Sequence, residues 1–311
     1  MAAPSLARRA PSASPYLLLA LAPFFWACNW IIGRGLHTEI PPLAMTFYRW
    51  TFAIAFMLPF ALPSVRRQWP IIRANYRVLL LLGVLGVGSH NALAYIGLNY
   101  TSATNGVILN SFIPVMIIAL SWAFLHQRLS NVQIAGVAVS LAGVLTILSR
   151  GSLALLASFR LNLGDVLIIV SMLLWSLYTI CLRWRPPGLD MLAFLLVIAC
   201  IGDAAVLPFY LAEASFSRQA QWSWQAVVAL ASIGLFSSFL AYVFWNRGVE
   251  RLGASVAGLF VHLMPVFGVL LAWLFLGEVL QGFHVIGIVL ILTGIYVTSR
   301  AAALPVPAAP E

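Results

Sequence analysis

Four ionisable side chains, Arg49, His90, Asp203 and His262, lie inside long apolar stretches of the sequence. An ionisable group in a hydrocarbon environment must face the protein interior or a partner group, so each of the four is a candidate functional residue. Asp203 is the only carboxylate well inside such a stretch, and it and the two histidines are the groups that could bind a proton there. Arg49 and Asp203 can instead form a structural ion pair.

Amide and aromatic side chains in the same stretches predict a lined cavity. Trp26 and Trp175 each lie about ten to twelve residues into an apolar stretch, which at about 1.5 Å per residue places both indoles near the middle of a membrane. Such rings either stack on a substrate or pack between helices, and both interpretations stay open. Trp122 lies towards the end of its stretch, so it is either an interfacial anchor or a cavity residue. The other candidate lining residues are Asn29, His90, Tyr95, Asn110, Tyr178, Tyr242 and Trp245.

Two prolines, Pro114 and Pro265, interrupt apolar stretches. Each removes one backbone hydrogen bond and exposes the carbonyl group four residues earlier. Ser111 and His262 occupy the equivalent positions three residues before these prolines. A polar group at this position either satisfies the freed backbone or faces a solute path, and the cost of an imidazole in lipid favours the path for His262.

The elements that position these residues must be membrane-spanning helices, because the composition excludes a water-soluble globule. Of the 311 residues, 62% are apolar and only 8% are charged, and the mean hydropathy is +0.99. Hydropathy and helix-breaking residues predict ten spans with short linkers and no soluble domain. These spans are residues 16–33, 42–62, 78–97, 103–124, 132–149, 164–182, 191–211, 226–245, 254–276 and 283–299.

The basic residues, all 17 of them arginines, predict the orientation of the chain. With the amino terminus inside, the inner segments hold twelve arginines and the outer loops four, and the excess belongs in the cytoplasm. We therefore expect both termini in the cytoplasm, in a bacterial inner membrane. The net charge of +9 reflects this bias, so we expect the lipid bilayer rather than nucleic acid as a partner.

An internal repeat divides the chain into two halves. A shift of 151 residues aligns 97–149 with 248–300 without a gap, and twelve of the 53 positions agree. A shift of 149 pairs Trp26 with Trp175, which places the first span in the mature fold rather than in a cleaved signal peptide. Because each half holds five spans, the second half must enter the membrane from the opposite side. Inverted repeats of this kind are typical of secondary transporters. The expected organisation is a cytoplasmic tail 1–15, a first repeat 16–149, a linker 150–163, a second repeat 164–300 and a cytoplasmic tail 301–311.

Small residues form a ridge in the last span of each half. Gly136, Ser140 and Gly143 share one helix face in the fifth span, and Gly287 and Gly294 repeat the spacing in the tenth. Small ridges allow helices to approach closely. We expect these two spans to support the fold rather than to contact substrate.

The stretch from Gly253 resembles the carboxy-terminal signature of the EamA group in the drug/metabolite transporter superfamily. Its core is residues 265–277, followed by Glu278, Gly287 and Gly294. The resemblance implies ten helices in two inverted five-helix repeats, and export of small metabolites, notably amino acids, as in many bacterial members.

The first half has the sister version of this signature over residues 111–129, and Trp26 and Arg49 fit the opening helices of the group. The resemblance therefore covers essentially the whole chain. One departure is His126–Gln127, where the second half has a glycine and a glutamate. A role for an acid at this turn is thus supported only in the second half.

Together these patterns predict a secondary transporter that exports small metabolites, with neutral or aromatic amino acids as the favoured cargo, by alternating access. A passive facilitator or pore, and drugs, nucleobases or other metabolites as cargo, stay open as alternatives. Proton antiport, exchange and downhill flow are equally open. An intramembrane enzyme would need a nucleophile with a base, or a carboxylate pair, and the sequence predicts neither, so no enzyme activity, metal or cofactor is expected. The oligomeric state is not defined, and a monomer is a sufficient functional unit.

Overall fold

The computed structural model describes residues 14–36, 38–101, 103–127, 129–152, 161–217, 219–276 and 279–303. Within these ranges the chain is helical and contains no strand. Ten helical spans are long and apolar enough to cross a membrane, which confirms the predicted all-α fold with ten spans. The predicted tails 1–15 and 301–311 and the linker 150–163 lie largely outside the described residues.

Five spans are single continuous helices. They are α1 (Pro15–Leu36), α2 (Pro42–Arg67), α8 (Asn131–Leu148), α11 (Met191–Phe216) and α16 (Gly282–Ala303). The predicted boundaries agree to within a few residues, except that α2 and α11 each extend about five residues beyond the predicted end. A helix can continue past the edge of the hydrocarbon, and hydropathy does not detect its polar last turn.

The other five spans are assembled from shorter segments. The third span contains α4 (Tyr76–Gly83), η1 (Val84–Ser89) and α5 (His90–Gly97), after the short helix α3 (Trp69–Ala74). The fourth contains α6 (Ala103–Asn110) and α7 (Ile113–Leu125), and the sixth contains α10 (Leu163–Cys181) and η2 (Leu182–Trp184). The eighth contains α12 (Trp224–Ser232), η3 (Ile233–Leu240) and α13 (Ala241–Leu252), and the ninth contains α14 (Ala254–Leu259), η4 (Phe260–His262) and α15 (Leu263–Leu276).

The interruptions in the fourth and ninth spans occur just before the two prolines. The chain leaves the α-helix between α6 and α7, and Pro114 is among the first residues of α7. In the ninth span the 3-10 turn η4 precedes Pro265. Because proline has no N–H and its ring opposes the carbonyl of the preceding turn, a change of helix type at these points is expected.

The third and eighth spans each contain a π-helical segment, η1 and η3. These segments start 149 residues apart and end 151 residues apart, because η1 has 6 residues and η3 has 8. The two additional residues of the second half therefore lie within η3. This insertion explains why the sequence repeat needs an offset of 149 before the segment and of 151 after it.

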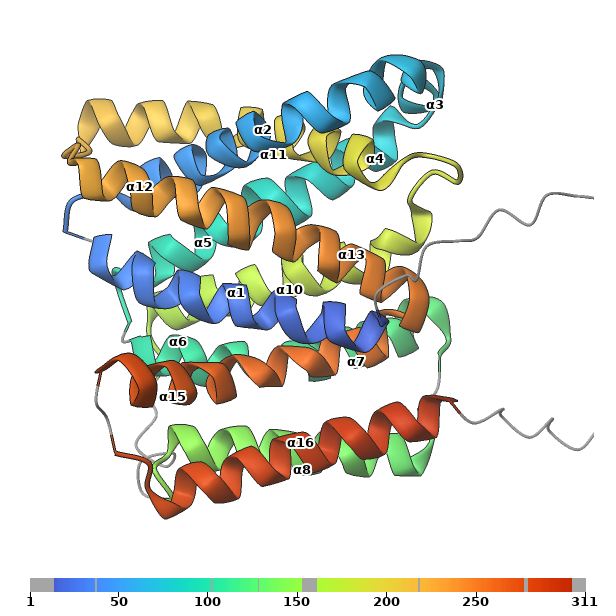
Figure 1. Ribbon diagram of the computed structural model, residues 1–311, viewed down its shortest axis with the longest axis vertical. Coiled ribbons are helices and arrows are strands. Elements are labelled where there is room, and N and C mark those ends of the chain that lie inside the picture. The colour runs from blue at the N-terminus through green and yellow to red at the C-terminus, as the bar shows by residue number, and fades with distance from the viewer. Residues whose placement is uncertain are drawn as a thin grey trace, which may run out of the picture.

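The helices form a bundle with a helix pair at each edge (Figure 1). α2 and α11 pack together at one edge, and α8 and α16 pack together at the other. α1 runs between them and contacts α13 and α15, while α10 contacts α5 and α7. α10 is the most enclosed span, with 61% of its apolar window buried inside the bundle.

The α8–α16 pair depends on its glycines. A Cβ atom on Gly143 would lie 2.6 Å from the carbonyl oxygen of Gly287, and one on Gly136 would lie 2.9 Å from that of Gly294. The predicted small-residue ridges therefore face each other. They allow the two backbones to touch.

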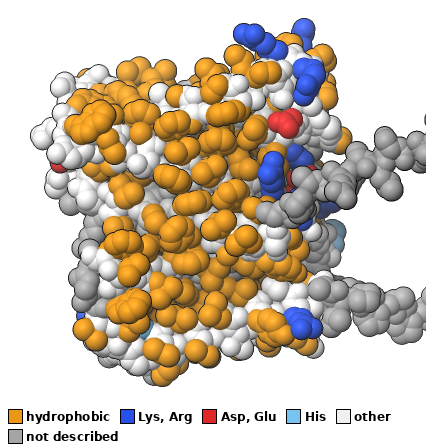
Figure 2. Space-filling view, viewed as in Figure 1, with side chains coloured by type: hydrophobic (Ala, Val, Ile, Leu, Met, Phe, Trp, Pro, Cys, Tyr) orange, Lys and Arg blue, Asp and Glu red, His pale blue; other side chains and the backbone are white. Residues whose placement is uncertain are grey.

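The surface shows how the bundle meets its surroundings. Apolar side chains cover the visible face across its width, and the cationic side chains gather at one end (Figure 2). We call this the arginine-rich end, and the other the opposite end, where α1 finishes and α2 begins. The described arginines at the arginine-rich end are Arg66, Arg67, Arg73, Arg77, Arg183, Arg185, Arg247, Arg251 and Arg300.

Candidate functional site

A cavity lies between the middle of the bundle and the opposite end. The volume open to the centres of water molecules inside it is about 60 Å³. It is lined mainly by residues from the second half of α1, the first third of α2, α5, α6 and the first two-thirds of α10, with one residue each from α7, α13, η4 and α15. Of the predicted site residues, this central cavity brings together Trp26, Asn29, Arg49, His90, Tyr95, Asn110, Trp175 and Tyr242.

Arg49 is the one charged side chain in the lining that cannot lose its charge. Its side chain is almost fully buried, at 1% exposure. Nε donates to Ser238 Oγ at 2.8 Å, and Nη1 donates to Asn91 Oδ1 at 3.1 Å and to the Tyr95 hydroxyl at 3.0 Å. All three partners are neutral, and no carboxylate of the described residues forms an ion pair with Arg49.

The alternative of an Arg49–Asp203 ion pair is wrong for this structure. Asp203 Oδ2 instead accepts a hydrogen bond from the Thr51 hydroxyl at 3.2 Å, and Oδ1 is buried with no partner among the described residues. The reason lies in helix geometry. Each helical residue turns by about 100°, so Arg49 and Thr51 point about 200° apart around α2. Thr51 therefore faces Asp203 on α11 while Arg49 faces the cavity.

Two contacts fix the part of α2 that carries Arg49. Gly234 in η3 lies so close to α2 that a Cβ atom on it would be 2.8 Å from the carbonyl oxygen of Arg49. At the start of α2, the Glu213 carboxylate of α11 accepts hydrogen bonds from the backbone N–H groups of Leu43 at 3.0 Å and Ala44 at 2.9 Å. An anion at this position satisfies free N–H groups and complements the helix dipole.

Hydrogen bonds link the polar side chains of the cavity into a chain. Asn29 bonds to the Tyr95 hydroxyl at 3.2 Å, Tyr95 and Asn91 both bond to Arg49, and Asn91 donates to the Tyr242 hydroxyl at 3.4 Å. These residues come from α1, α2, α5 and α13. A polar solute in the cavity would therefore meet groups from both halves of the chain.

Six aromatic residues close the cavity on the side of the arginine-rich end. Trp26 meets Trp175 edge to face with ring centroids 5.2 Å apart, and Trp245 lies 5.3 Å from Trp26 and 5.6 Å from Trp175. Tyr178 and Trp245 are fully buried and lie behind the lining rather than in it. We call this set the aromatic cluster; its members are Trp26, Trp50, Trp175, Tyr178, Tyr242 and Trp245.

The two π-helical segments position this cluster. The carbonyl of Ser237 in η3 accepts a hydrogen bond from Trp26 Nε1 at 3.1 Å, and the carbonyl of Gly86 in η1 accepts one from the Tyr242 hydroxyl at 2.6 Å. A π-turn shifts the pattern of backbone hydrogen bonds, which makes such carbonyls available to side chains. Each half thus supplies a backbone acceptor to an aromatic residue of the cluster.

His90 lines the cavity and is fixed against α10. Its Nδ1 lies 3.0 Å from the carbonyl oxygen of Ser171 and 2.8 Å from the Ser171 hydroxyl, which itself donates to the His90 carbonyl. The imidazole ring also packs 5.0 Å from the Trp175 ring. Its position is therefore tied to the aromatic cluster.

His262 and Ser111 lie at a second cavity, next to the first. Nε2 of His262 lies 2.8 Å from the Ser111 carbonyl oxygen, and Nδ1 lies 2.7 Å from the Ser140 hydroxyl. Because a carbonyl only accepts, Nε2 carries a proton and the Ser140 hydroxyl can donate to Nδ1 of a neutral ring. His262 thus satisfies the Ser111 carbonyl rather than one of the carbonyls freed by the prolines, and it also lines the second cavity.

The second cavity is larger and more apolar than the first. The volume open to water centres is about 300 Å³. Its lining comes from α1, α8, η4 and α15 together with Asn110 and Ser111. It shares a wall with the central cavity, made of Trp30, Asn110, Val261 and Met264.

Trp122 lies away from both cavities. Its side chain is 60% exposed on the outside of the bundle, where an indole contacts lipid or its interface. The turn His126–Gln127 is described, but its counterpart Gly277–Glu278 lies outside the described residues.

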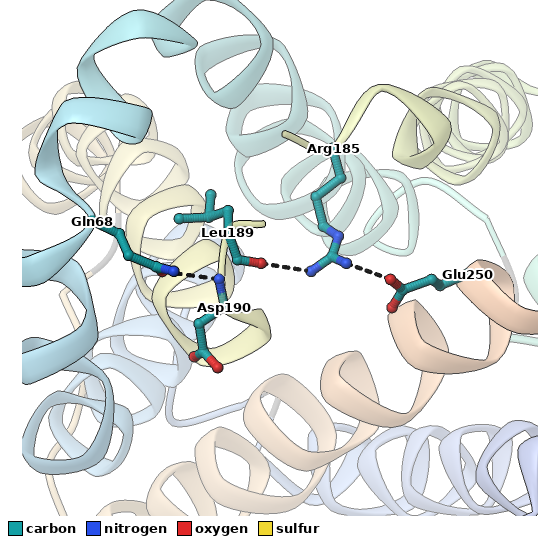
Figure 3. A network of polar contacts seen from close by, with 5 residues as sticks. All are labelled: Gln68, Arg185, Leu189, Asp190 and Glu250. Carbon is teal, nitrogen blue, oxygen red and sulfur yellow. Dashed lines mark hydrogen bonds and ion pairs between the residues drawn. The ribbon is translucent and has the colours of Figure 1, made fainter. Parts of the chain in front are cut away.

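A polar network ties the α10–α11 loop to other helices at the arginine-rich end (Figure 3). Arg185 forms an ion pair with Glu250 at the end of α13 and donates to the Leu189 carbonyl at 3.0 Å. Gln68, between α2 and α3, accepts from the Asp190 N–H at 2.9 Å. This network lies beyond the aromatic cluster, nearer this end of the bundle.

Sequence reasoning did not select Ser171 and Ser238, although they hold His90 and Arg49. Serines are common in apolar stretches, and no spacing distinguishes these two from the rest. Asn91 is a further residue of the site that is not among the predicted site residues. Its position one residue after His90 and its offset of 151 from Tyr242 are the signals that point to it.

Comparison with known proteins gives one consistent family. The model of the EamA-like transporter family matches the chain twice, over residues 13–149 and 162–300. A solved crystal structure superimposes with a TM-score of 0.75 at 19% identity, over 93% of this chain and 98% of the other, which supports the fold.

Similar full-length proteins occur in bacteria, archaea and plants. The uncharacterized transporter YyaM of Bacillus subtilis is 26% identical over 93% of this chain and 95% of its own. An uncharacterized transporter of Archaeoglobus fulgidus is 29% identical over 91% of this chain and 96% of its own. A WAT1-related protein of Arabidopsis thaliana is 25% identical over 86% and 80%.

Proposed function

Because the chain belongs to the EamA-like transporter family, we propose that it is a secondary transporter that exports small metabolites, with neutral or aromatic amino acids as the favoured substrates. The observation that supports this most directly is the central cavity, which joins a polar chain to an aromatic cluster in the membrane interior. Rings can stack on an apolar side chain, and amide, hydroxyl and guanidinium groups can bind a polar backbone.

Contacts between repeat-related residues support an inverted repeat. Trp26 meets Trp175, Asn91 bonds to Tyr242, and the Ser111 carbonyl bonds to His262. The members of each pair lie 149 or 151 residues apart, as in the sequence repeat. Equivalent groups can touch each other only close to a two-fold axis. The reciprocal glycine contacts between α8 and α16 also support a two-fold axis between the two halves. An axis that relates antiparallel helices in this way lies in the membrane plane.

We infer an orientation from the arginines. The arginine-rich end would face the cytoplasm, which places both termini there, and the protein would lie in the inner membrane of a bacterium. In this orientation the central cavity is nearer the outer side. The aromatic cluster and the network around Arg185 then separate substrate from the cytoplasm.

Alternating access requires these two closures to separate while the other side closes. A passive pore, by contrast, needs a continuous path. The fully buried Trp245 and Tyr178 obstruct such a path in this conformation, which favours a carrier over a pore.

The test is counterflow in liposomes that contain the purified protein and are preloaded with unlabelled neutral and aromatic amino acids. A carrier gives saturable, transient accumulation of external labelled substrate, whereas a pore gives linear flux and no overshoot. If no amino acid in the panel shows counterflow, the substrate assignment is wrong. Nucleobases, drugs and other metabolites are then tested in the same vesicles.

A further inference from the structure

We infer that the central cavity binds its substrate through a carboxylate at Arg49, and that it recognises small apolar monocarboxylates whether or not they have an amino group. This inference rests on the proposed function and specifies which part of the substrate the site recognises.

Arg49 is a buried charge without an opposite charge nearby. Its exposure is 1%, its hydrogen-bond partners Ser238, Asn91 and Tyr95 are neutral, and Asp203 points elsewhere. Removing an ion from water costs several kcal/mol unless a counter-ion compensates for it. The described residues supply no such partner, so an anionic substrate is the group that would complete the site.

The geometry of the guanidinium group also fits a carboxylate. Nε and Nη1 make all the hydrogen bonds of Arg49 to described residues, and Nη2 has no partner among them. Nη2 therefore has two N–H groups that can donate to a carboxylate, which accepts without donating. Asn91 and Asn29 offer amide N–H groups beside it.

The lining is asymmetric in charge. Among the described residues it contains Arg49 but no aspartate or glutamate. A carboxylate therefore gains an opposite charge on binding, while an ammonium group meets only neutral acceptors such as the side-chain oxygens of Asn29 and Asn110. The carboxylate should be essential for binding and the ammonium group dispensable.

The second cavity provides space for the apolar part of such a substrate. It shares Trp30, Val261 and Met264 with the central cavity and is the larger of the two. A molecule with its carboxylate at Arg49 can extend past these side chains into apolar surroundings. The combination selects an amphipathic acid of the size of an aromatic amino acid.

The experiment compares three ligands of the same shape on the wild-type protein: phenylalanine, 3-phenylpropionate and phenethylamine. Binding is measured in detergent by quenching of tryptophan fluorescence, because several tryptophans lie at the site. We expect phenylalanine and 3-phenylpropionate to bind with affinities within about tenfold of each other, and phenethylamine to bind at least about 30-fold more weakly.

Variants then assign the effect to Arg49. Arg49→Gln should lower the affinity for 3-phenylpropionate by at least about 30-fold, with a smaller loss in Arg49→Lys, which keeps the charge but not the planar guanidinium group. Arg247→Gln, an exposed arginine outside the site, is the matched control and should bind normally. Size-exclusion profiles check that each variant is folded, and the ligand comparison on the wild type stands even if Arg49→Gln does not fold.

Two results would overturn the inference. One is phenethylamine binding as tightly as 3-phenylpropionate, and the other is no binding of either acid. Counterflow of a neutral or cationic solute in the same preparation would then show that the transporter assignment stands and only the carboxylate site is wrong. Absence of counterflow for every solute would instead contradict the proposed function.

Discussion

The indole rings of Trp26 and Trp175 meet at 90° with their centroids 5.2 Å apart, although the residues are 149 positions apart in the chain. They come from α1 and α10, the first helix of each half. Their contact places the first span of each half at the centre of the molecule, against the central cavity. The aromatic cluster is built around this pair, so substitutions of the two tryptophans test whether the cluster binds substrate.

Trp26→Ala should lower the apparent affinity for substrate by about tenfold, since about 1.4 kcal/mol of contact energy corresponds to that factor. Trp26 is only partly buried, so the variant should fold, whereas Trp175→Ala would leave a cavity in the core. Trp175→Phe is therefore the better second variant. Initial rates of counterflow are measured against substrate concentration.

Trp224→Ala is the matched control, because this indole is 75% exposed and far from the cavity. It should transport as the wild type does. If the Trp26 and Trp175 variants also transport normally at equal folded yield, the cluster has no role in substrate binding.

Gly143→Ala should destabilise the bundle without changing the site. The new Cβ atom would lie 2.6 Å from the Gly287 carbonyl oxygen and 2.8 Å from the Ile291 nitrogen, so α8 and α16 must move apart. Overpacking of this kind costs about 1–3 kcal/mol. The measurement is the unfolding temperature in detergent. Gly35→Ala, where nothing lies within 4 Å, is the control and should leave it unchanged or raise it. Equal unfolding temperatures for the two variants would contradict the close approach of α8 and α16.

Much of this arrangement could be predicted from the sequence, because it depends on properties of single helices. The ten spans follow from apolar length, the breaks follow from Pro114 and Pro265, and the faces of α8 and α16 that approach another helix closely follow from the spacing of their small residues. Each of these signals is local, so tertiary contacts do not alter it.

The rest depends on how each helix is rotated, which a single sequence does not specify. An ion pair between Arg49 on span two and Asp203 on span seven was left open, and α2 does pack on α11, but Asp203 meets Thr51 rather than Arg49. The side chains of Arg49 and Thr51 point about 200° apart around α2, so the rotation of this helix decides which of the two faces Asp203. Trp122 is a second example. Its depth in the span could be estimated from the sequence, but the helix face that it occupies could not.

Weakening the network at the arginine-rich end should favour conformations open to that end. The Arg185–Glu250 pair is partly exposed, with side-chain exposures of 17% and 50%, so it contributes at most about 1 kcal/mol. Glu250→Gln should therefore raise the open population by up to about fivefold. Cys181 is buried at the end of α10 beneath this network, and its rate of labelling by a maleimide reports the opening.

The labelling uses a background in which Cys28 and Cys200 are replaced by serine, so that only Cys181 reacts. Arg183→Gln, an exposed neighbour of Arg185, is the control and should not change the rate. Unchanged labelling in Glu250→Gln would mean that the ion pair does not hold this end closed.

His262→Ala should impair transport by uncoupling α8 from the ninth span. The imidazole bridges the Ser140 hydroxyl of α8 and the Ser111 carbonyl, so its loss leaves a carbonyl and a hydroxyl unsatisfied beside the second cavity. A buried polar group left without a partner costs about 1–3 kcal/mol. His262→Gln can keep one of the two bonds and should retain more activity than His262→Ala. Counterflow rates are compared at equal folded yield, with Ser140→Ala as a variant that removes only the bond to α8. If His262→Ala is fully active, the residue serves packing alone, and transport does not depend on this link between the supporting pair and the ninth span.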